Sequence, residues 1–170
     1  VPLDIFRTPD ARGFGLRCLE TLRRGQFIDV YLGEVITDTE ATAREASQQG
    51  KDKASYLFSL DKFAGESEIT DEDCFVVDGE FFGGPTRFMN HSCAPNVQMH
   101  TVSYNKYDLF VYDLAFFACE DIPAGQELTF DYMDADDGED SKLEEDREGP
   151  ERKKVPCLCG AERCRGFLWT

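Results

Sequence analysis

Residues 87–96 read RFMNHSCAPN and residues 127–132 read ELTFDY, and these two blocks carry most of the fold prediction. The polar stretch at 90–93 (NHSC) has two interpretations from residue types alone. It is either a buried turn whose Asn and His side chains satisfy backbone groups, or part of a catalytic site. No activated Ser or Cys with a matching acid accompanies His91, so hydrolase chemistry is not supported.

The second block ends in two aromatic residues that flank an acid. Strand alternation points Phe130 and Tyr132 to the same face of a strand. Such rings are most often core packing. They can also form the wall of a narrow pocket for a cationic alkylamine, because the ring quadrupole attracts a cation.

Outward from these blocks, short apolar segments separated by Gly, Pro and Asp predict mostly β-structure. The expected strands are residues 3–7, 14–19, 27–32, 56–60, 74–77, 109–119 and 128–132. One helix is predicted from the capping-box spacing of Thr37 and Glu40, ending near Gly50. A short helical turn is expected at 86–90.

Two turns share one layout, at residues 22–26 (LRRGQ) and 122–126 (IPAGQ). A glycine at the fourth position suits a tight turn with a positive φ. We interpret the likeness as two similar turns and not as a repeat.

Length and charge exclude several classes of protein. The 170 residues suit a single domain, and 41% hydrophobic residues with 14 Phe can build a core. The net charge of -16 disfavours nucleic acid and anionic membranes and favours basic partners. The longest apolar run, residues 114–119, is too short to span a bilayer. Because residue 1 is Val and no leader pattern opens the chain, we expect a segment of a longer, non-secreted protein.

The seven cysteines fall into two groups. Those in apolar, strand-like stretches are expected to be small buried hydrophobes: Cys18, Cys74 and Cys119. Three crowd the end of the chain and favour a tetrahedral zinc site: Cys157, Cys159 and Cys164. The candidates for a fourth ligand are Cys93, His91 and His100. The alternative is a set of free or disulfide-linked thiols.

Residues 12–15 (RGFG) place two glycines around an aromatic ring, which lets backbone approach a ligand closely. No third glycine follows, so dinucleotide binding is disfavoured and a plain strand turn is the alternative.

Residues 133–154 contain ten acidic and five basic residues, which predicts a solvated, mobile linker.

A family resemblance emerges from the order of five segments. These are residues 12–15, Tyr31-Leu32-Gly33-Glu34, residues 87–96, residues 127–132 and the terminal cysteines. The pattern resembles SET-domain lysine methyltransferases with a post-SET zinc motif, over nearly the whole chain. Within that family the chain is similar to heterochromatin-type enzymes that methylate lysine 9 of histone H3, fungal members especially.

The resemblance implies a mainly β SET fold. Small β-sheets would surround a knot-like core, with few short helices and a C-terminal zinc-bound post-SET tail. The SET domain would cover residues 1–132, an acidic mobile linker 133–156, and the post-SET zinc motif 157–170. The cysteine-rich pre-SET cluster of this branch is missing from the chain, and we expect it upstream.

The resemblance also assigns site residues. S-adenosyl-L-methionine would lie in a surface pocket lined by Arg12, Phe14, Gly15, Tyr56, Arg87, Asn90 and His91. The catalytic set would be Tyr132, Tyr56 and Phe130. The substrate channel would be lined by Phe130 and closed from the tail by Trp169. The zinc ligands would be Cys93, Cys157, Cys159 and Cys164.

These roles imply a chemistry for the site. A dry aromatic channel beside a sulfonium would disfavour the lysine ammonium, and the Tyr132 hydroxyl would orient the amine. Because Phe130 has no hydroxyl to hold the amine, trimethylation is expected.

The resemblance also implies partners and a place in the cell. The expected partners are the histone H3 N-terminal tail and other chromatin proteins in the nucleus, with no direct nucleic-acid binding by this domain and no membrane. The alternatives are a methyltransferase for another histone lysine or a non-histone protein, a catalytically silent chromatin-binding module, and a zinc-clamped scaffold.

The predicted linker contains lysines between Tyr132 and the terminal cysteines, namely Lys142, Lys153 and Lys154. The tether would hold them at high effective concentration near the site. One of them would then be able to enter the lysine channel in cis, either blocking substrate or becoming methylated.

Overall fold

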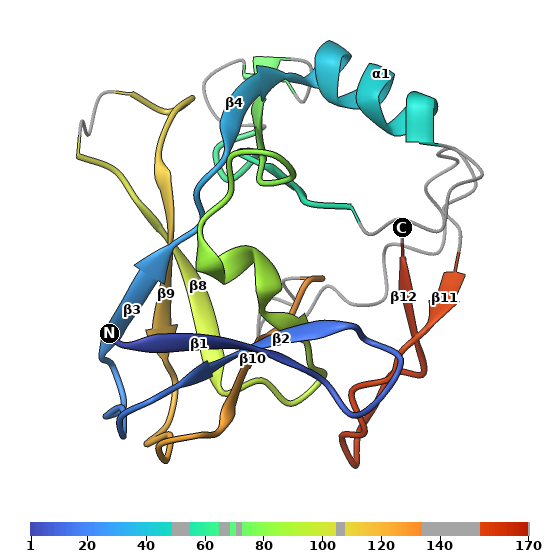
Figure 1. Cartoon of the computed structure of the whole chain (residues 1–170). Coiled ribbons are helices and arrows are strands. Elements are labelled where there is room, and N and C mark those ends of the chain that lie inside the picture. The colour runs from blue at the N-terminus through green and yellow to red at the C-terminus, as the bar shows by residue number, and fades with distance from the viewer. Residues whose placement is uncertain (49–54, 65–68, 71–72, 105–107, 134–153, 170) are drawn as a thin grey trace.

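The structure is a computed structural model that describes residues 1–48, 55–64, 69–70, 73–104, 108–133 and 154–169. Within these residues the chain forms four small β-sheets and one α-helix (Figure 1), which confirms the predicted mainly β fold. The strands are β1 (Leu3–Arg7), β2 (Phe14–Cys18), β3 (Phe27–Val30), β4 (Glu34–Thr37), β5 (Leu57–Ser59), β6 (Phe75–Asp78), β7 (Asn90–His91), β8 (Val97–Val102), β9 (Asp113–Ala118), β10 (Glu127–Phe130), β11 (Lys154–Pro156) and β12 (Phe167–Trp169). The helices are α1 (Asp38–Gln48) and the 3-10 helix η2 (Pro85–Phe88). None of the helices described is long and apolar enough to cross a membrane.

The sheets are small and mostly antiparallel. Their strand orders are β1-β2-β10-β7, β3-β9-β8, β4-β6-β5 and the tail hairpin β11-β12. Among the described strands only β7 and β10 run parallel. In Figure 1 strands β1 and β2 of the first sheet run across the lower half of the picture, while α1 lies at the top, beyond β4.

The hydrophobic core lies where these sheets face one another. Several of its largest fully buried side chains come from β2, β9, β10 and the two predicted turns, namely Leu16, Leu22, Phe116, Ile122, Leu128 and Phe130. Burying a side chain of this size stabilises the fold by about 1.5–3 kcal/mol. Because Phe130 is part of this core and also of the candidate site, the site is built on a rigid element.

The two predicted turns pair with each other. The amides of Leu22 and Ile122 each donate to the other residue's carbonyl, both at 2.9 Å. Gly25 and Gly125 have φ of 80° and 85°, as predicted, and each amide donates at 2.7 Å to the strand that precedes the other turn. The strands after the turns are exchanged as well, since β3 pairs with β9 and β10 pairs with β2. The two turns therefore join two sheets across an approximate local two-fold.

The predicted helix forms, and its start is capped as expected. The Thr37 hydroxyl accepts a hydrogen bond from the Glu40 amide at 3.2 Å. The Glu40 carboxylate does not complete the box but pairs with Arg44 at 2.9 Å. Arg44 also bonds the Asp78 carboxylate of β6 at 2.6 Å, and this ion pair fixes α1 against the β4-β6-β5 sheet. The predicted terminator, Gly50, lies outside the described residues.

The strands differ from the sequence prediction in three main respects. The predicted strand at 109–119 begins only at Asp113, because the Asp108 carboxylate accepts the amides of Phe110 and Val111 and forms a turn there. Strands β4, β7, β8 and β12 were not predicted. Residues 154–156, which the sequence analysis assigns to the linker, form β11 because they pair with β12. Most of the predicted linker, including Lys142 and Lys153, lies outside the described residues.

Candidate active site

The two sequence blocks lie side by side as parallel strands. Asn90 of β7 is opposite Thr129 of β10, and His91 is opposite Phe130. The Ser92 amide then donates to the Phe130 carbonyl at 3.0 Å. This pairing places Asn90 and the Tyr132 segment next to each other, as the resemblance implies.

Asn96 extends this pairing beyond β7, and its role was not predicted. Its side-chain amide donates to the Glu127 carbonyl at 2.8 Å, and its side-chain oxygen accepts the Thr129 amide at 2.9 Å. The Asn96 residue is only 6% exposed. The Asn96 side chain thus forms hydrogen bonds with the β10 backbone as a neighbouring strand would, and it fixes β10 just before Phe130.

Tyr132 is held at its backbone and at its hydroxyl. Its amide donates to Nδ1 of His91 at 3.1 Å, and its hydroxyl donates to the Met89 carbonyl at 2.6 Å. Although 44% of Tyr132 is exposed, the hydroxyl points to the fully buried Met89, and burial raises the pKa of the phenol. The neighbouring Tyr56 raises that pKa further. The phenol therefore stays protonated. Its hydroxyl donates to the Met89 carbonyl, and its oxygen can accept a second hydrogen bond.

Aromatic side chains surround this hydroxyl-bearing ring. The Tyr132 ring lies 4.8 Å from Phe130, which lies 5.7 Å from Phe58, and Phe58 lies 4.6 Å from Tyr31. Phe116 backs Phe130 at 4.9 Å. The result is an apolar wall of the kind that suits the methylene chain of a lysine.

Tyr31 is a site residue that the sequence analysis quoted only as part of a motif. It is 6% exposed, and its hydroxyl donates to the Tyr56 carbonyl at 2.8 Å. Burial and the nearby Tyr132 raise its pKa. Tyr31, Tyr56 and Tyr132 thus form one cluster of phenols, in which the Tyr56 ring is covered by Arg87 and Tyr31 packs on Phe58.

Several predicted cofactor residues form a second, contiguous cluster. The Arg87 guanidinium lies 3.9 Å from the Tyr56 ring centroid and 4.8 Å from that of Phe88. Phe88 contacts Phe14 edge-on at 6.2 Å, and Phe14 is 57% exposed. The exposed ring of Phe14 can stack on an aromatic ring of a ligand, and the nearby Arg87 guanidinium can pair with a ligand carboxylate.

Asn90 and Arg12 meet at a carboxylate that the sequence analysis missed. The Asn90 amide nitrogen donates to the Phe14 carbonyl at 3.0 Å and to Glu127 at 2.8 Å. Arg12 forms a two-point pair with the same Glu127, at 3.2 and 3.1 Å. The orientation of the Asn90 side chain is therefore fixed. A Cβ on Gly15 would lie 2.8 Å from Oε1 of Glu127 and 3.0 Å from the Phe6 ring, so a larger residue there would displace the carboxylate that Asn90 and Arg12 share.

The His91 ring is buried, and both of its nitrogens contact other protein groups. It is 4% exposed, and burial lowers its pKa. Its Nδ1 accepts the Tyr132 amide, and its Nε2 lies 3.2 Å from the Cys93 sulfur. Its ring therefore supports Tyr132 from within the protein.

Four cysteines meet where the tail reaches β7. The Sγ atoms of Cys93, Cys157, Cys159 and Cys164 all lie within 4.8 Å of one another. A zinc ion about 2.3 Å from four thiolates separates the sulfurs by roughly 3.8 Å, so this donor set fits tetrahedral zinc. All seven cysteines are free, and His100 lies on β8 against Phe117, outside the cluster. Of the three candidates for a fourth ligand, only Cys93 joins the tail cysteines.

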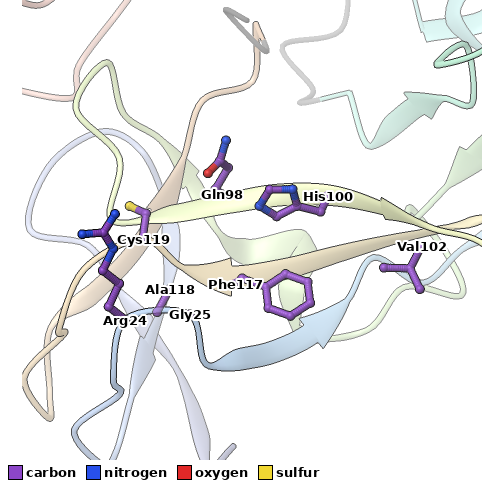
Figure 2. Close-up of a pocket in the computed structure, with 8 residues that line it drawn as sticks. All are labelled: Arg24, Gly25, Gln98, His100, Val102, Phe117, Ala118 and Cys119. Carbon is purple, nitrogen blue, oxygen red and sulfur yellow. The ribbon is translucent and has the colours of Figure 1, made fainter. Parts of the chain in front are cut away.

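A shallow hollow of about 460 Å³ lies elsewhere, over β8 and β9 (Figure 2). Figure 2 shows Arg24 and Cys119 at one end of this hollow and Val102 at the other, with His100 and Phe117 between them. None of its lining residues belongs to the aromatic or cysteine clusters.

The fold and the site define the class of the protein: the chain belongs to the SET-domain family, whose pattern matches residues 13–133. This confirms the predicted resemblance. The chain is 46% identical to an H3 lysine-9 specific histone-lysine N-methyltransferase, KMT1 of Fusarium mangiferae, covering 99% of this chain and 49% of that protein. It is also 46% identical to H3 lysine-9 specific dim-5 of Neurospora crassa, covering 99% of this chain and 51% of that protein. The chain spans about half the length of these curated relatives.

Solved structures show the same relationship. One, described as bearing on the product specificity of histone lysine methyltransferases, has a TM-score of 0.80 at 44% identity, covering 99% of this chain and 57% of that one. The structure of the Neurospora SET domain protein DIM-5, a histone lysine methyltransferase, has a TM-score of 0.72 at 46% identity, covering 84% of this chain and 56% of that one.

Proposed function

We propose that the chain is the catalytic portion of a protein lysine methyltransferase that uses S-adenosyl-L-methionine and trimethylates lysine 9 of histone H3. The observation that carries the proposal is the Tyr132 hydroxyl, fixed on the Met89 carbonyl beside the aromatic wall of Phe58 and Phe130. The proposed substrate, lysine 9 of histone H3, is the one named in the descriptions of the similar fungal proteins.

The cofactor would supply an activated methyl group on a sulfonium. Its site would be the cluster around Phe14, Tyr56, Arg87 and Asn90, where an exposed ring, a guanidinium and a fixed amide lie together. The other predicted cofactor residues would act by support: Arg12 by holding Glu127, Gly15 by leaving room for it, and His91 by holding Tyr132.

The chain's own residues would prepare the lysine amine. Its unperturbed pKa is about 10.4, and an apolar wall raises the cost of keeping it charged. The Tyr132 oxygen, whose hydroxyl hydrogen is donated to the Met89 carbonyl, would accept a hydrogen bond from an N–H of the amine and so direct the nitrogen lone pair away from the ring. Alignment of this kind can contribute roughly 7–11 kcal/mol to lowering a barrier.

The four cysteines would hold a structural zinc ion that fastens the tail to β7. This would bring β12, with Trp169, to the site from the C-terminal side, and Trp169 remains a predicted channel residue. The division into a SET domain, a linker and a post-SET motif remains a proposal with it.

The charge of the chain suits a basic histone tail in chromatin, and we propose a nuclear role in heterochromatin with other chromatin proteins as partners. The net charge of -16 favours a lysine-rich peptide over nucleic acid. Strand β5 is one of the two edge strands of its sheet in the described residues, and Phe58, the middle residue of β5, belongs to the aromatic wall. An extended peptide would be able to pair with it.

Mass spectrometry of histone H3 peptides incubated with the protein and cofactor tests this function. We expect methyl groups on the peptide that contains lysine 9 and none on a matched peptide with lysine 9 replaced by arginine. Methylation confined to another lysine, or to a non-histone protein, would replace the substrate. Cofactor binding without any transfer would indicate a silent module, and zinc without cofactor binding a scaffold.

Phe130→Tyr is expected to shift the products from trimethyl toward mono- and dimethyl lysine. The new hydroxyl would lie in the aromatic cluster and would hold the amine, or a water, in one orientation, so that the nitrogen turns less easily for a further transfer. The measurement is the ratio of methylation states at matched turnover.

The matched control is Phe117→Tyr, which adds the same hydroxyl on β9 outside the cluster. The control should leave the product ratio unchanged. An unaltered ratio in Phe130→Tyr would contradict the assignment of Phe130.

A further inference from the structure

Tyr132 lies just beyond the end of a strand, so sheet pairing does not hold it. β10 ends at Phe130, and the last register pair is Phe130 with His91. The position of Tyr132 therefore depends on side-chain contacts. Two of these are its bonds to His91 and Met89. The residue between Phe130 and Tyr132 provides a third anchor.

Asp131 faces the C-terminal tail, which contains three of the four clustered cysteines. Its Oδ1 accepts a hydrogen bond from Nη2 of Arg165 at 2.6 Å and another from the Met133 amide at 2.9 Å. The same oxygen lies 3.5 Å from Nδ1 of His91, the atom that accepts the Tyr132 amide. One carboxylate thus contacts the tail, the residue after Tyr132 and the histidine that holds Tyr132.

Arg165 belongs to the cysteine cluster through its backbone. It follows Cys164 directly, and its amide donates to the Cys93 sulfur at 3.4 Å. The next residue, Gly166, has a φ of 84°, which lets the tail turn at this point. The Arg165 and Asp131 side chains are 30% and 21% exposed. An ion pair this short and this shielded is held more firmly than one in open solvent.

We propose that Asp131 and Arg165 form a latch, a pair of positioning residues through which the docked tail sets the position of Tyr132. This inference rests on the proposed function. When the tail is seated on the cysteine cluster, Arg165 holds Asp131, and Asp131 holds the backbone on either side of Tyr132. Loosening the pair moves the Tyr132 hydroxyl without removing a group that touches the substrate.

Two single variants and their combination test the latch. Asp131→Asn keeps an oxygen for the Met133 amide and removes the charge, while Arg165→Met keeps the bulk of the stem and removes the guanidinium. We expect each to lower kcat by about 10- to 100-fold with little change in KM, because misplacement of a reacting group acts on kcat. The double variant should be no slower than the slower single, since both break one interaction. Arg163→Met is the matched control, because it removes an exposed charge from the same tail.

A second readout does not depend on methylation. Hydrogen exchange should become faster at the amides of residues 131–133 in both single variants, at unchanged zinc content and melting temperature. If the wild-type protein transfers no methyl group, the proposed function fails while this measurement still tests the latch. Unchanged exchange, additive losses in kcat, or an equal loss in Arg163→Met would overturn the proposal. Loss of zinc in Arg165→Met with normal exchange and kcat in Asp131→Asn would also overturn it.

Discussion

Tyr132→Phe is expected to lower kcat by about 100- to 1,000-fold while cofactor affinity stays nearly unchanged. The variant removes one oxygen and leaves the ring against Phe130 and His91. Losing a single preorganised polar group at the reacting atoms costs this much in other enzymes. A methyl-transfer assay gives kcat, and a separate binding measurement gives the cofactor affinity.

The raised pKa of Tyr132 determines which protonation state of the phenol takes part in the reaction. A phenol whose pKa lies above its usual value of about 10 is still protonated at neutral and mildly alkaline pH. Tyr132 therefore acts as an orienting group and not as an ionised base. Any rise of the rate with pH in that range should reflect deprotonation of the lysine.

Tyr104→Phe is the control, since Tyr104 is 89% exposed and lies on a loop outside the site. It should retain full activity. Wild-type turnover in Tyr132→Phe would remove Tyr132 from the mechanism.

Removal of zinc is the second prediction with a large effect. A strong chelator, or Cys159→Ser, should abolish methylation and lower the melting temperature. Without a metal ion no central atom joins the four sulfurs, and because the β11–β12 pairing is internal to the tail, the tail would then be held to the rest of the protein mainly by the Arg165–Asp131 ion pair. Structural zinc sites contribute folding free energy directly. Metal analysis should give one zinc per chain before treatment and restored activity after zinc is returned.

Cys119→Ser is the matched control. Cys119 is partly buried, and its sulfur bonds the Pro95 carbonyl at 3.4 Å, which a serine hydroxyl can also do. This variant should keep its zinc and its activity. A protein that is purified without zinc and is nevertheless active would refute the structural role of the metal.

Local signals allowed much of the fold to be predicted. The cap at Thr37 and the glycine turns are decided by residues close in sequence, so the structure agrees there. β8 was missed although its residues, VQMHTV, alternate, with polar Gln98 and His100 on the exposed side, which is a strand pattern. Its partner is the next strand, β9, to which it pairs from Val97–Ala118 to Val102–Asp113.

The candidate site was predictable where a residue belongs to a recognisable block, and not where it acts through a distant neighbour. Glu127 and Asn96 lie in quoted segments, but their bonds to Arg12 and Thr129 span 115 and 33 residues. The latch joins Asp131 to Arg165 across 34 residues. A single sequence contains no record of such distances. A buried asparagine or an acid between two aromatic residues is the only local hint.

The exchanged strands around Leu22 and Ile122 have a consequence for how the chain acquires its shape. Neither half can complete a sheet from nearby residues, because β2 waits for β10 and β3 waits for β9, about a hundred positions later. Closing such large loops is entropically costly and slows folding. During synthesis β2 can pair with β1 at once, but β2 and β3 must wait until the ribosome has released β10 and β9 before their sheets can be completed.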